Sequence, residues 1–170
     1  CLYFLGLSCF PISVMALMNI FYSFYFDYLT DIKSYAATLF LSFLIGFLLL
    51  KVGKKEKESI NIYEQIFLIF LIYFSISFLI QIPIYFSDYN VSFIDSYFES
   101  ISGLTGTGFT IFEHVKSLDS PLILWRSSSQ WIGGLYFLIF LVLIFSNKQI
   151  NFKLVDFSFN LEKKINFSPN

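Results

Sequence analysis

Hydroxyl side chains and glycines alternate in the middle of the chain, between Phe98 and Phe109, where side-chain bulk almost disappears. This run lies between two strongly apolar segments, one ending at Phe86 and the next beginning near Leu122. In a bilayer, irregular backbone is tolerated only where protein buries it or where it lines a watery cavity. The run therefore contains candidate backbone carbonyls of the kind that replace the water around potassium in selectivity filters. The four candidate residues are Thr105, Gly106, Thr107 and Gly108.

The composition of the chain indicates that lipid is its solvent. Of 170 residues, 56% are hydrophobic and 22% aromatic, whereas only 14% are charged. Soluble domains carry about 25% charged residues, and a chain of this length cannot form a core large enough to bury so much apolar surface. We therefore predict an all-α polytopic membrane protein. The net charge of −1 and the lack of a visible basic face argue against a nucleic-acid partner.

Four segments are long and apolar enough to cross a hydrocarbon core of about 30 Å as helices. These segments are Leu2–Tyr25, Tyr35–Val52, Ile66–Phe86 and Pro121–Phe145.

A fifth, short helix is predicted from Ser92 to Ser102. Ser92 is a candidate N-cap with Asp95 three residues later, and apolar residues recur at helical spacing as far as Ile101. So short a helix cannot span a bilayer, which favours a re-entrant or interfacial position. If it enters the membrane from outside, the partial negative charge of its C-terminal end favours a cation there. The chain must then return over Leu104 to Ile111, where glycines permit unusual backbone angles.

The lysines predict the orientation of the chain. One group follows the second apolar segment and another follows the fourth: Lys51, Lys54, Lys55 and Lys57, then Lys148, Lys153, Lys163 and Lys164. The connections on the other side have few basic residues and several acidic ones, namely Lys33, Lys116 and Arg126 against Asp27, Asp31, Asp88, Asp95, Glu113 and Asp119. The positive-inside rule places both lysine groups, and with them the N-terminus, in the cytoplasm.

Two ionisable residues near the candidate loop are open to more than one interpretation. Glu99 is either a structural carboxylate satisfied by backbone amides or an ion ligand, since ionisable residues inside membranes are functional candidates. Arg126 can extend to the membrane surface, pair with Glu99 or stiffen the loop. We expect both residues to support the pore.

Two motifs resemble those of the Trk/Ktr/HKT superfamily of potassium transporters, specifically the bacterial Trk-type translocation subunit. The first motif is Phe98–Gly108, and the second runs from Leu124 to Ser127 and from Gln130 to Gly134. Their order and spacing fit the family, and two helices before the repeat are typical of Trk-type members. The likeness extends from about Leu5 to Phe145.

The resemblance implies a fold of four membrane–pore–membrane repeats around one pore. Residues 1–58 would form the N-terminal transmembrane helix pair with its cytoplasmic lysine-rich loop. Residues 59–146 would form the first repeat, with a pore helix at about 92–102 and a filter at 104–110. Residues 147–170 would be a cytoplasmic tail or a linker to the missing repeats. Carbonyls of Thr105, Gly106 and Thr107 would be this repeat's share of the K+ sites, and Gly108 would be its selective glycine.

The same resemblance implies potassium uptake across a bacterial cytoplasmic (inner) membrane, with no organic cofactor. The implied partners are the lipid bilayer, the remaining repeats, a second copy in a homodimer, and a cytoplasmic nucleotide-binding regulatory ring protein. Because the chain begins at Cys1 without methionine, we expect its true N-terminus to be missing. Because three of the four repeats are absent, we expect a truncated sequence, with a second chain or a self-assembled tetramer as other sources of the missing repeats.

Two alternatives belong to other functional classes. A non-conducting or degenerate scaffold subunit is suggested by Gly106, where the family usually has threonine, and by Tyr136, near which it usually has glycine. A membrane-embedded enzyme would use Ser102, His114 and Asp119, but these residues have no recognised elbow motif and no evident oxyanion site. We therefore predict that the chain is not an enzyme.

Overall fold

The structure of the chain is a computed structural model that describes residues 2–28, 32–53 and 62–146. Within these ranges the chain is helical and has no strand. The elements are α1 (Leu2–Tyr25), α2 (Ile32–Gly53), α3 (Ile62–Tyr85), α4 (Phe93–Thr105), the 3-10 turn η1 (Val115–Ser117) and α5 (Ser120–Ser146). Helices α1, α2, α3 and α5 are long and apolar enough to cross a membrane. The predicted class, an all-α polytopic membrane protein, is confirmed.

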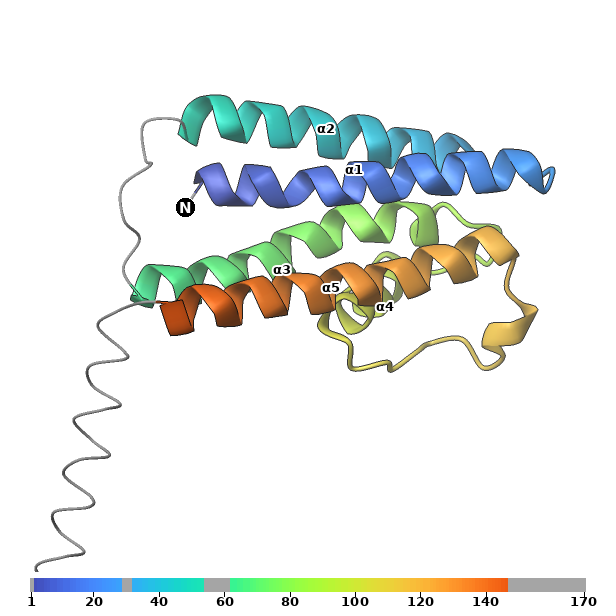
Figure 1. Cartoon of the computed structure of the whole chain (residues 1–170). Coiled ribbons are helices and arrows are strands. Elements are labelled where there is room, and N and C mark those ends of the chain that lie inside the picture. Colours follow the sequence, from blue (N-terminus) through green and yellow to red (C-terminus); the bar gives the residue numbers. More distant parts are fainter. Residues whose placement is uncertain (1, 29–31, 54–61, 147–170) are drawn as a thin grey trace, which may run out of the picture.

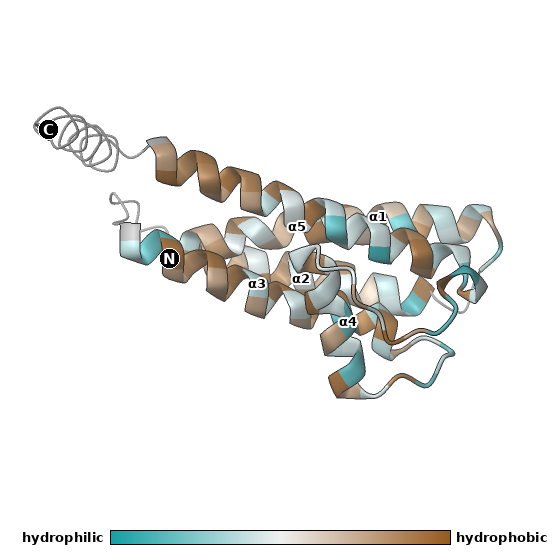
Figure 2. Cartoon of the chain, turned by 90° about the horizontal axis from the view of Figure 1, so that it is seen from below, coloured by the Kyte–Doolittle hydropathy of each residue, from teal (hydrophilic) through white to brown (hydrophobic). Residues whose placement is uncertain are grey.

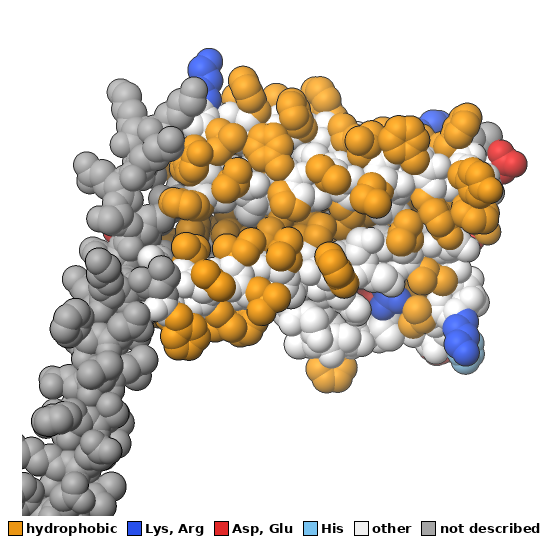
Figure 3. All heavy atoms as spheres, viewed as in Figure 1, with side chains coloured by type: hydrophobic (Ala, Val, Ile, Leu, Met, Phe, Trp, Pro, Cys, Tyr) orange, Lys and Arg blue, Asp and Glu red, His pale blue; other side chains and the backbone are white. Residues whose placement is uncertain are grey.

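The four long helices run alongside one another, with α1 beside α2 and α3 beside α5 (Figure 1). We call the end where α2 ends and α3 begins the Lys51 end, and the opposite end the loop end. Hydrophilic residues gather around α4 and the loops at the loop end, whereas α5 is hydrophobic toward the Lys51 end (Figure 2). Apolar side chains are spread along the long helices on the face shown in Figure 3. The surface thus suits a lipid solvent.

Small residues bring α1 and α2 into close contact. A Cβ atom built on Gly6 would lie 2.9 Å from the carbonyl oxygen of Gly46, and one on Gly46 would lie 3.1 Å from that of Gly6. Further along the interface, the hydroxyl oxygens of Ser13 and Ser42 are 2.7 Å apart. Small residues and interhelical hydrogen bonds drive helix association where lipid provides no hydrophobic contrast.

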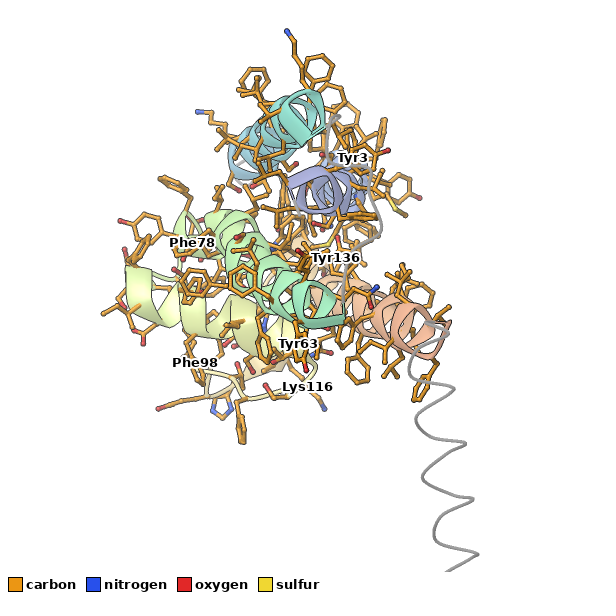
Figure 4. The ribbon with its side chains drawn as sticks, turned by 90° about the vertical axis from the view of Figure 1, so that its left-hand side faces the viewer. Tyr3, Tyr63, Phe78, Phe98, Lys116 and Tyr136 are labelled. Carbon is orange, nitrogen blue, oxygen red and sulfur yellow. The ribbon has the colours of Figure 1, made fainter. Side chains whose placement is uncertain are left out.

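Two aromatic residues of α5 connect it to the other long helices. The Trp125 side chain is fully buried, donates from its indole nitrogen to the carbonyl of Ile80 in α3 (2.9 Å), and lies with its ring centroid 5.4 Å from that of Tyr35 in α2. Tyr136 lies in the middle of the bundle (Figure 4) and donates to the carbonyl of Ser8 in α1 (2.5 Å). The bulky residue at position 136 thus makes a contact with the N-terminal helix.

The short helix begins as predicted and ends later than predicted. Ser92 is the N-cap, and its hydroxyl oxygen accepts from the backbone N–H of Asp95 at 3.2 Å. The helix continues through Gly103 to Thr105 and ends at Gly106, which adopts the left-handed conformation. Leu104 and Thr105, predicted as part of the filter, therefore lie in the last helical turn. The predicted tail and the lysines at positions 54, 55 and 57 lie outside the described residues.

Candidate ion-binding pore loop

Two glycines shape the loop that follows α4. Gly106 has φ +71° and Gly108 has φ +76°, in the region that L-residues with a side chain rarely adopt. A Cβ atom at either position would meet nothing within 4 Å, so glycine is required here by backbone conformation and not by lack of space. The backbone N–H groups of Gly106, Thr107 and Gly108 turn back toward the carbonyl of Ser102, with N–O distances of 3.1 Å for Thr107 and 3.5 Å for Gly108. The loop therefore folds over the end of its own helix.

The buried hydroxyl of Ser102 connects the helix to the far end of the loop. It donates to the carbonyl oxygen of Phe109 (2.7 Å) and lies 3.1 Å from the hydroxyl of Thr107. Thr105 makes a more local bond, because its hydroxyl donates to the carbonyl of Ile101 in the preceding turn (2.7 Å). Ser102 is thus the side chain that closes the loop.

The loop leaves a group of carbonyl oxygens available to a ligand. Among the described residues, no hydrogen bond ends on the carbonyl oxygens of four consecutive exposed residues, which are Thr105, Gly106, Thr107 and Gly108. By contrast, the carbonyls of Ser102, Gly103 and Phe109 do accept hydrogen bonds, whereas that of the buried Leu104 lies against Gly133 of α5. The exposed free acceptors therefore include the residues predicted to coordinate an ion.

Behind the loop, a buried ion pair joins α4 to α5. One carboxylate oxygen of Glu99, which is 3% exposed, accepts from the Nε of Arg126 (2.6 Å) and is also paired with its Nη2. The other carboxylate oxygen of Glu99 accepts from the backbone N–H of Ile111 (2.9 Å) and from the hydroxyl of Thr110 (3.1 Å). Arg126 also donates to Thr110 (3.0 Å) and lies over the ring of Phe112, 5.5 Å from its centroid. Of the interpretations left open for Arg126, the structure therefore shows pairing with Glu99 and contact with the return of the loop.

Helix α5 passes directly against the C-terminal end of α4. A Cβ atom on Gly133 would lie 1.7 Å from the carbonyl oxygen of Leu104, and one on Gly103 would lie 2.7 Å from the hydroxyl oxygen of Ser129. The Tyr73 hydroxyl from α3 donates to the carbonyl of Gly133 (2.8 Å). Gly134 differs, because a Cβ there would meet nothing within 4 Å. Only the first glycine of the pair makes the close helix contact that small residues permit.

An open groove of about 1030 Å³ lies between α3, α5 and the end of α4. Thr105 and Gly106 line it near the loop, whereas Ile66 and Ile144 line it toward the Lys51 end. Most of its lining is aliphatic or aromatic, but Gln130 of α5 contributes an amide. Sequence reasoning missed Gln130 as a residue of this groove, because only the helix arrangement tells which side of α5 faces the loop.

The residues of the hypothetical enzyme show no mutual contact in the described part of the chain. The Ser102 hydroxyl bonds within the loop, the carbonyl of His114 accepts from Ser117 in η1 (2.7 Å), and the Asp119 backbone N–H donates to the Tyr89 hydroxyl (2.9 Å). Across the described ranges, no three His, Cys, Asp or Glu side chains are grouped as metal ligands. The donors that the loop offers to a cation are therefore backbone carbonyls.

The chain is similar to known cation transporters. Residues 31–153 match the family model of TrkH, described as a cation transport protein. A cation transporter of Methanocaldococcus jannaschii is 30% identical over 133 residues, which cover 78% of this chain and 27% of that protein. The Trk system potassium uptake protein TrkH of Escherichia coli K12 is 30% identical over 113 residues, covering 66% of this chain and 23% of the relative. The Trk system potassium uptake protein TrkI of Halomonas elongata is 34% identical over 77 residues, which cover 45% of this chain and 16% of that protein.

The chain thus spans about a quarter of the length of the first two relatives. No solved structure matches it. The family match contains α2 to α5, the candidate loop after α4 and the Glu99–Arg126 pair. Because the match covers well over half of the sequence, and because members of this family are transporters and not enzymes, the chain is a member of the TrkH family of cation transport proteins.

Proposed function

We propose that this chain is part of a potassium uptake protein and contributes one strand of its selectivity filter. The observation that carries the proposal is the set of four consecutive carbonyls, Thr105 to Gly108, that no group in the described chain uses as acceptors. The names of the bacterial relatives, which are potassium uptake proteins, support potassium as the cargo.

The chemistry of the loop suits the binding of a partly dehydrated cation. The carbonyls of Gly106 and Thr107, together with that of Thr105, replace part of the hydration shell of K+. They lie at the C-terminal end of α4, where the unsatisfied carbonyls of the helix give a partial negative charge. Because this attraction is moderate, an ion can enter and leave the site, as conduction requires.

The ion pair behind the loop holds the strand in place. Glu99 lies on α4 and Arg126 on α5, and both contact Thr110 at the point where the loop returns. A buried pair of this kind is rigid only when its remaining lone pairs and protons have partners, and here the backbone N–H of Ile111 supplies one. Glu99 and Arg126 are therefore positioning residues, and the ion ligands are the carbonyls.

The lysines support the proposed orientation of the chain in the membrane. Lys51 lies in the last turn of α2, and more lysines follow it in the sequence, so the Lys51 end is cytoplasmic under the positive-inside rule. The N-terminus of α1 is on the same side. The loop end then faces outward, and K+ moves from the pore loop toward the Lys51 end across a bacterial cytoplasmic membrane.

One strand cannot surround an ion, so the complete filter needs three more. These strands come from further sequence of the same protein, from a second chain or from copies of this chain. The homodimer and the cytoplasmic nucleotide-binding ring remain predictions, which the mass of the purified assembly and co-purification from native membranes would test.

The decisive experiment compares the substitutions Gly108→Ser and Gly106→Ser in the complete protein expressed from its own gene. Both glycines have positive φ and open surroundings, so the two variants carry similar backbone strain. Uptake of K+ and Na+ would be measured in cells that lack other potassium uptake systems. We expect Gly108→Ser to lower the preference for K+ over Na+, and Gly106→Ser to lower uptake of both ions with less change in preference.

An unchanged ion preference in the Gly108→Ser variant would contradict the filter proposal. The scaffold alternative, suggested by the residues at positions 106 and 136, predicts that the wild-type protein assembles normally but transports neither ion. The left-handed conformation of Gly106 provides a structural reason for glycine at that position and so weakens this alternative.

A further inference from the structure

Two consecutive residues of α5, Trp125 and Arg126, make contacts on different sides of this helix. The fully buried Trp125 indole donates to the carbonyl of Ile80 in α3 and lies against the ring of Tyr35 in α2. The Arg126 guanidinium instead pairs with Glu99 of α4. Because successive residues of an α-helix project about 100° apart, a rotation of α5 that moved Trp125 would move Arg126 as well.

Tyr35 brings the N-terminal helix pair, α1 and α2, to this turn of α5. Helix α2 packs mainly against α1, and Tyr35 lies in its first turn, at the loop end of the bundle. The Tyr35 side chain is almost completely buried, and its ring centroid lies 5.4 Å from that of Trp125. Aromatic rings at this separation stabilise one another beyond the burial of their surfaces. The contact therefore links the N-terminal helix pair to the turn of α5 that contains Arg126.

The same part of α5 also holds the loop after α4. Arg126 donates to Thr110, where the loop returns, in addition to its pairing with Glu99. About one turn further along α5, Ser129 lies so close to Gly103 that a Cβ there would be 2.7 Å from the serine hydroxyl oxygen. A rotation of α5 about its axis would change both contacts. Since ion selection depends on the arrangement of the coordinating carbonyls, the orientation of this turn bears on which ion the loop suits.

We propose that the N-terminal helix pair positions the loop after α4 through the contact between Tyr35 and Trp125. Held from α2 and α3, the Trp125 ring sets the rotation of α5, and this rotation directs Arg126 toward Glu99. Tyr35 and Trp125 are thus positioning residues for ion selection, although neither lies in the loop. The inference rests on the proposed function of the loop, because a change in loop geometry alters ion preference only if the loop selects ions.

Removal of the Tyr35 ring from the complete protein tests the proposal by transport. We expect Tyr35→Leu to lower the preference for K+ over Na+ by between about twofold and thirtyfold, the range typical of coupling between remote sites. Tyr35→Phe, which keeps the ring, should retain the wild-type preference.

Gly6→Ala is the matched control for Tyr35→Leu. The added methyl group would crowd the carbonyl of Gly46, so it disturbs the same helix pair about three turns from Tyr35 along α2. This variant should be less stable than the wild type but keep its ion preference. An unchanged preference in Tyr35→Leu, or an equal change in Gly6→Ala, would overturn the proposal.

Thermal stability gives a second readout, which does not depend on transport. In the described chain, Glu99 accepts hydrogen bonds from α5 and from the return of the loop. If Tyr35 helps to orient Arg126, the pair with Glu99 is already weakened in Tyr35→Leu. Glu99→Gln should then lower the Tm less in the Tyr35→Leu background than in the wild type, whereas independent sites have additive effects. Equal falls in Tm in the two backgrounds would contradict the proposal.

Trp125→Phe extends the comparison to the other partner, and it replaces Tyr35→Leu if that variant does not fold. Phenylalanine keeps a ring beside Tyr35 but cannot donate to the carbonyl of Ile80. We expect a smaller change in ion preference than in Tyr35→Leu and again a reduced effect of Glu99→Gln on the Tm. Gly108→Ser reports on the loop alone, so an unchanged preference there counts against the proposed function, whereas additive changes in Tm count against this inference only.

Discussion

At the scale of single residues, we expect the Glu99–Arg126 pair to be sensitive to substitution. The carboxylate is almost completely buried and has four donor contacts, two of them from the guanidinium. Glu99→Gln would leave Arg126 without a counter-charge, and removing one partner of a buried pair costs about 3–5 kcal/mol. We expect a marked fall in Tm of the detergent-solubilised protein and a loss of K+ uptake.

Arg126→Lys tests the geometry of the same pair. Lysine keeps the charge but cannot contact Glu99 through two nitrogen atoms and Thr110 at once, so its Tm should lie between those of the wild type and Glu99→Gln. A Glu99→Gln protein as stable as the wild type would show that the pair does not support the loop.

A comparison of two buried serines of α4 separates the effect of the loop contact from that of a hydrogen bond within the helix. The Ser102 hydroxyl reaches across to the carbonyl of Phe109, whereas the Ser100 hydroxyl donates to the carbonyl of Ser96 in its own helix (2.7 Å). Loss of either hydrogen bond costs about 1 kcal/mol. We expect similar small losses of stability from Ser102→Ala and Ser100→Ala, but a change in K+ affinity or ion preference only from Ser102→Ala. Equal transport by the two variants would refute a role of Ser102 in shaping the loop.

At the scale of elements, the contact between α5 and the end of α4 depends on one glycine. In Gly133→Ala the added methyl group would overlap the carbonyl of Leu104, so α5 must move away from α4. Overpacking of this kind typically costs about 1–3 kcal/mol or more. We expect reduced folded yield by size-exclusion chromatography and reduced transport.

Gly134→Ala is the matched control, because a Cβ there meets nothing within 4 Å. Alanine favours a helix interior by about 1 kcal/mol over glycine, so this variant should be at least as stable as the wild type. A Gly133→Ala protein that behaves like Gly134→Ala would mean that the two helices do not meet as described.

At the scale of the whole molecule, the prediction concerns orientation. Lys51 and Asp88 are both exposed and lie at opposite ends of the bundle. An impermeant thiol reagent added to intact cells should modify Asp88→Cys, and it should modify Lys51→Cys only after the membrane is permeabilised. The physical reason is the excess of lysines after α2, which are retained in the cytoplasm. Labelling of Lys51→Cys in intact cells would contradict the proposed orientation.

The sequence by itself determined the class of the protein and most of its elements. A run of about 20 apolar residues satisfies its backbone in lipid by forming a helix, so the four long helices follow from length and composition alone. The Ser92 cap is equally local, since the serine hydroxyl and its Asp95 partner are three residues apart. The division into repeats and the ion-coordinating role of the loop were also expected from sequence, and both remain predictions.

Only the tertiary structure decided how these elements meet around the loop. It extended α4 beyond Gly103 to Thr105, because this glycine packs against Ser129 of α5 and the chain turns only at Gly106. It also paired Glu99 with Arg126, which are 27 residues apart, and distinguished Gly133 from Gly134. Such contacts depend on the crossing and rotation of whole helices, which are set by the packing of distant side chains. A local pattern of residue types contains no information about that geometry.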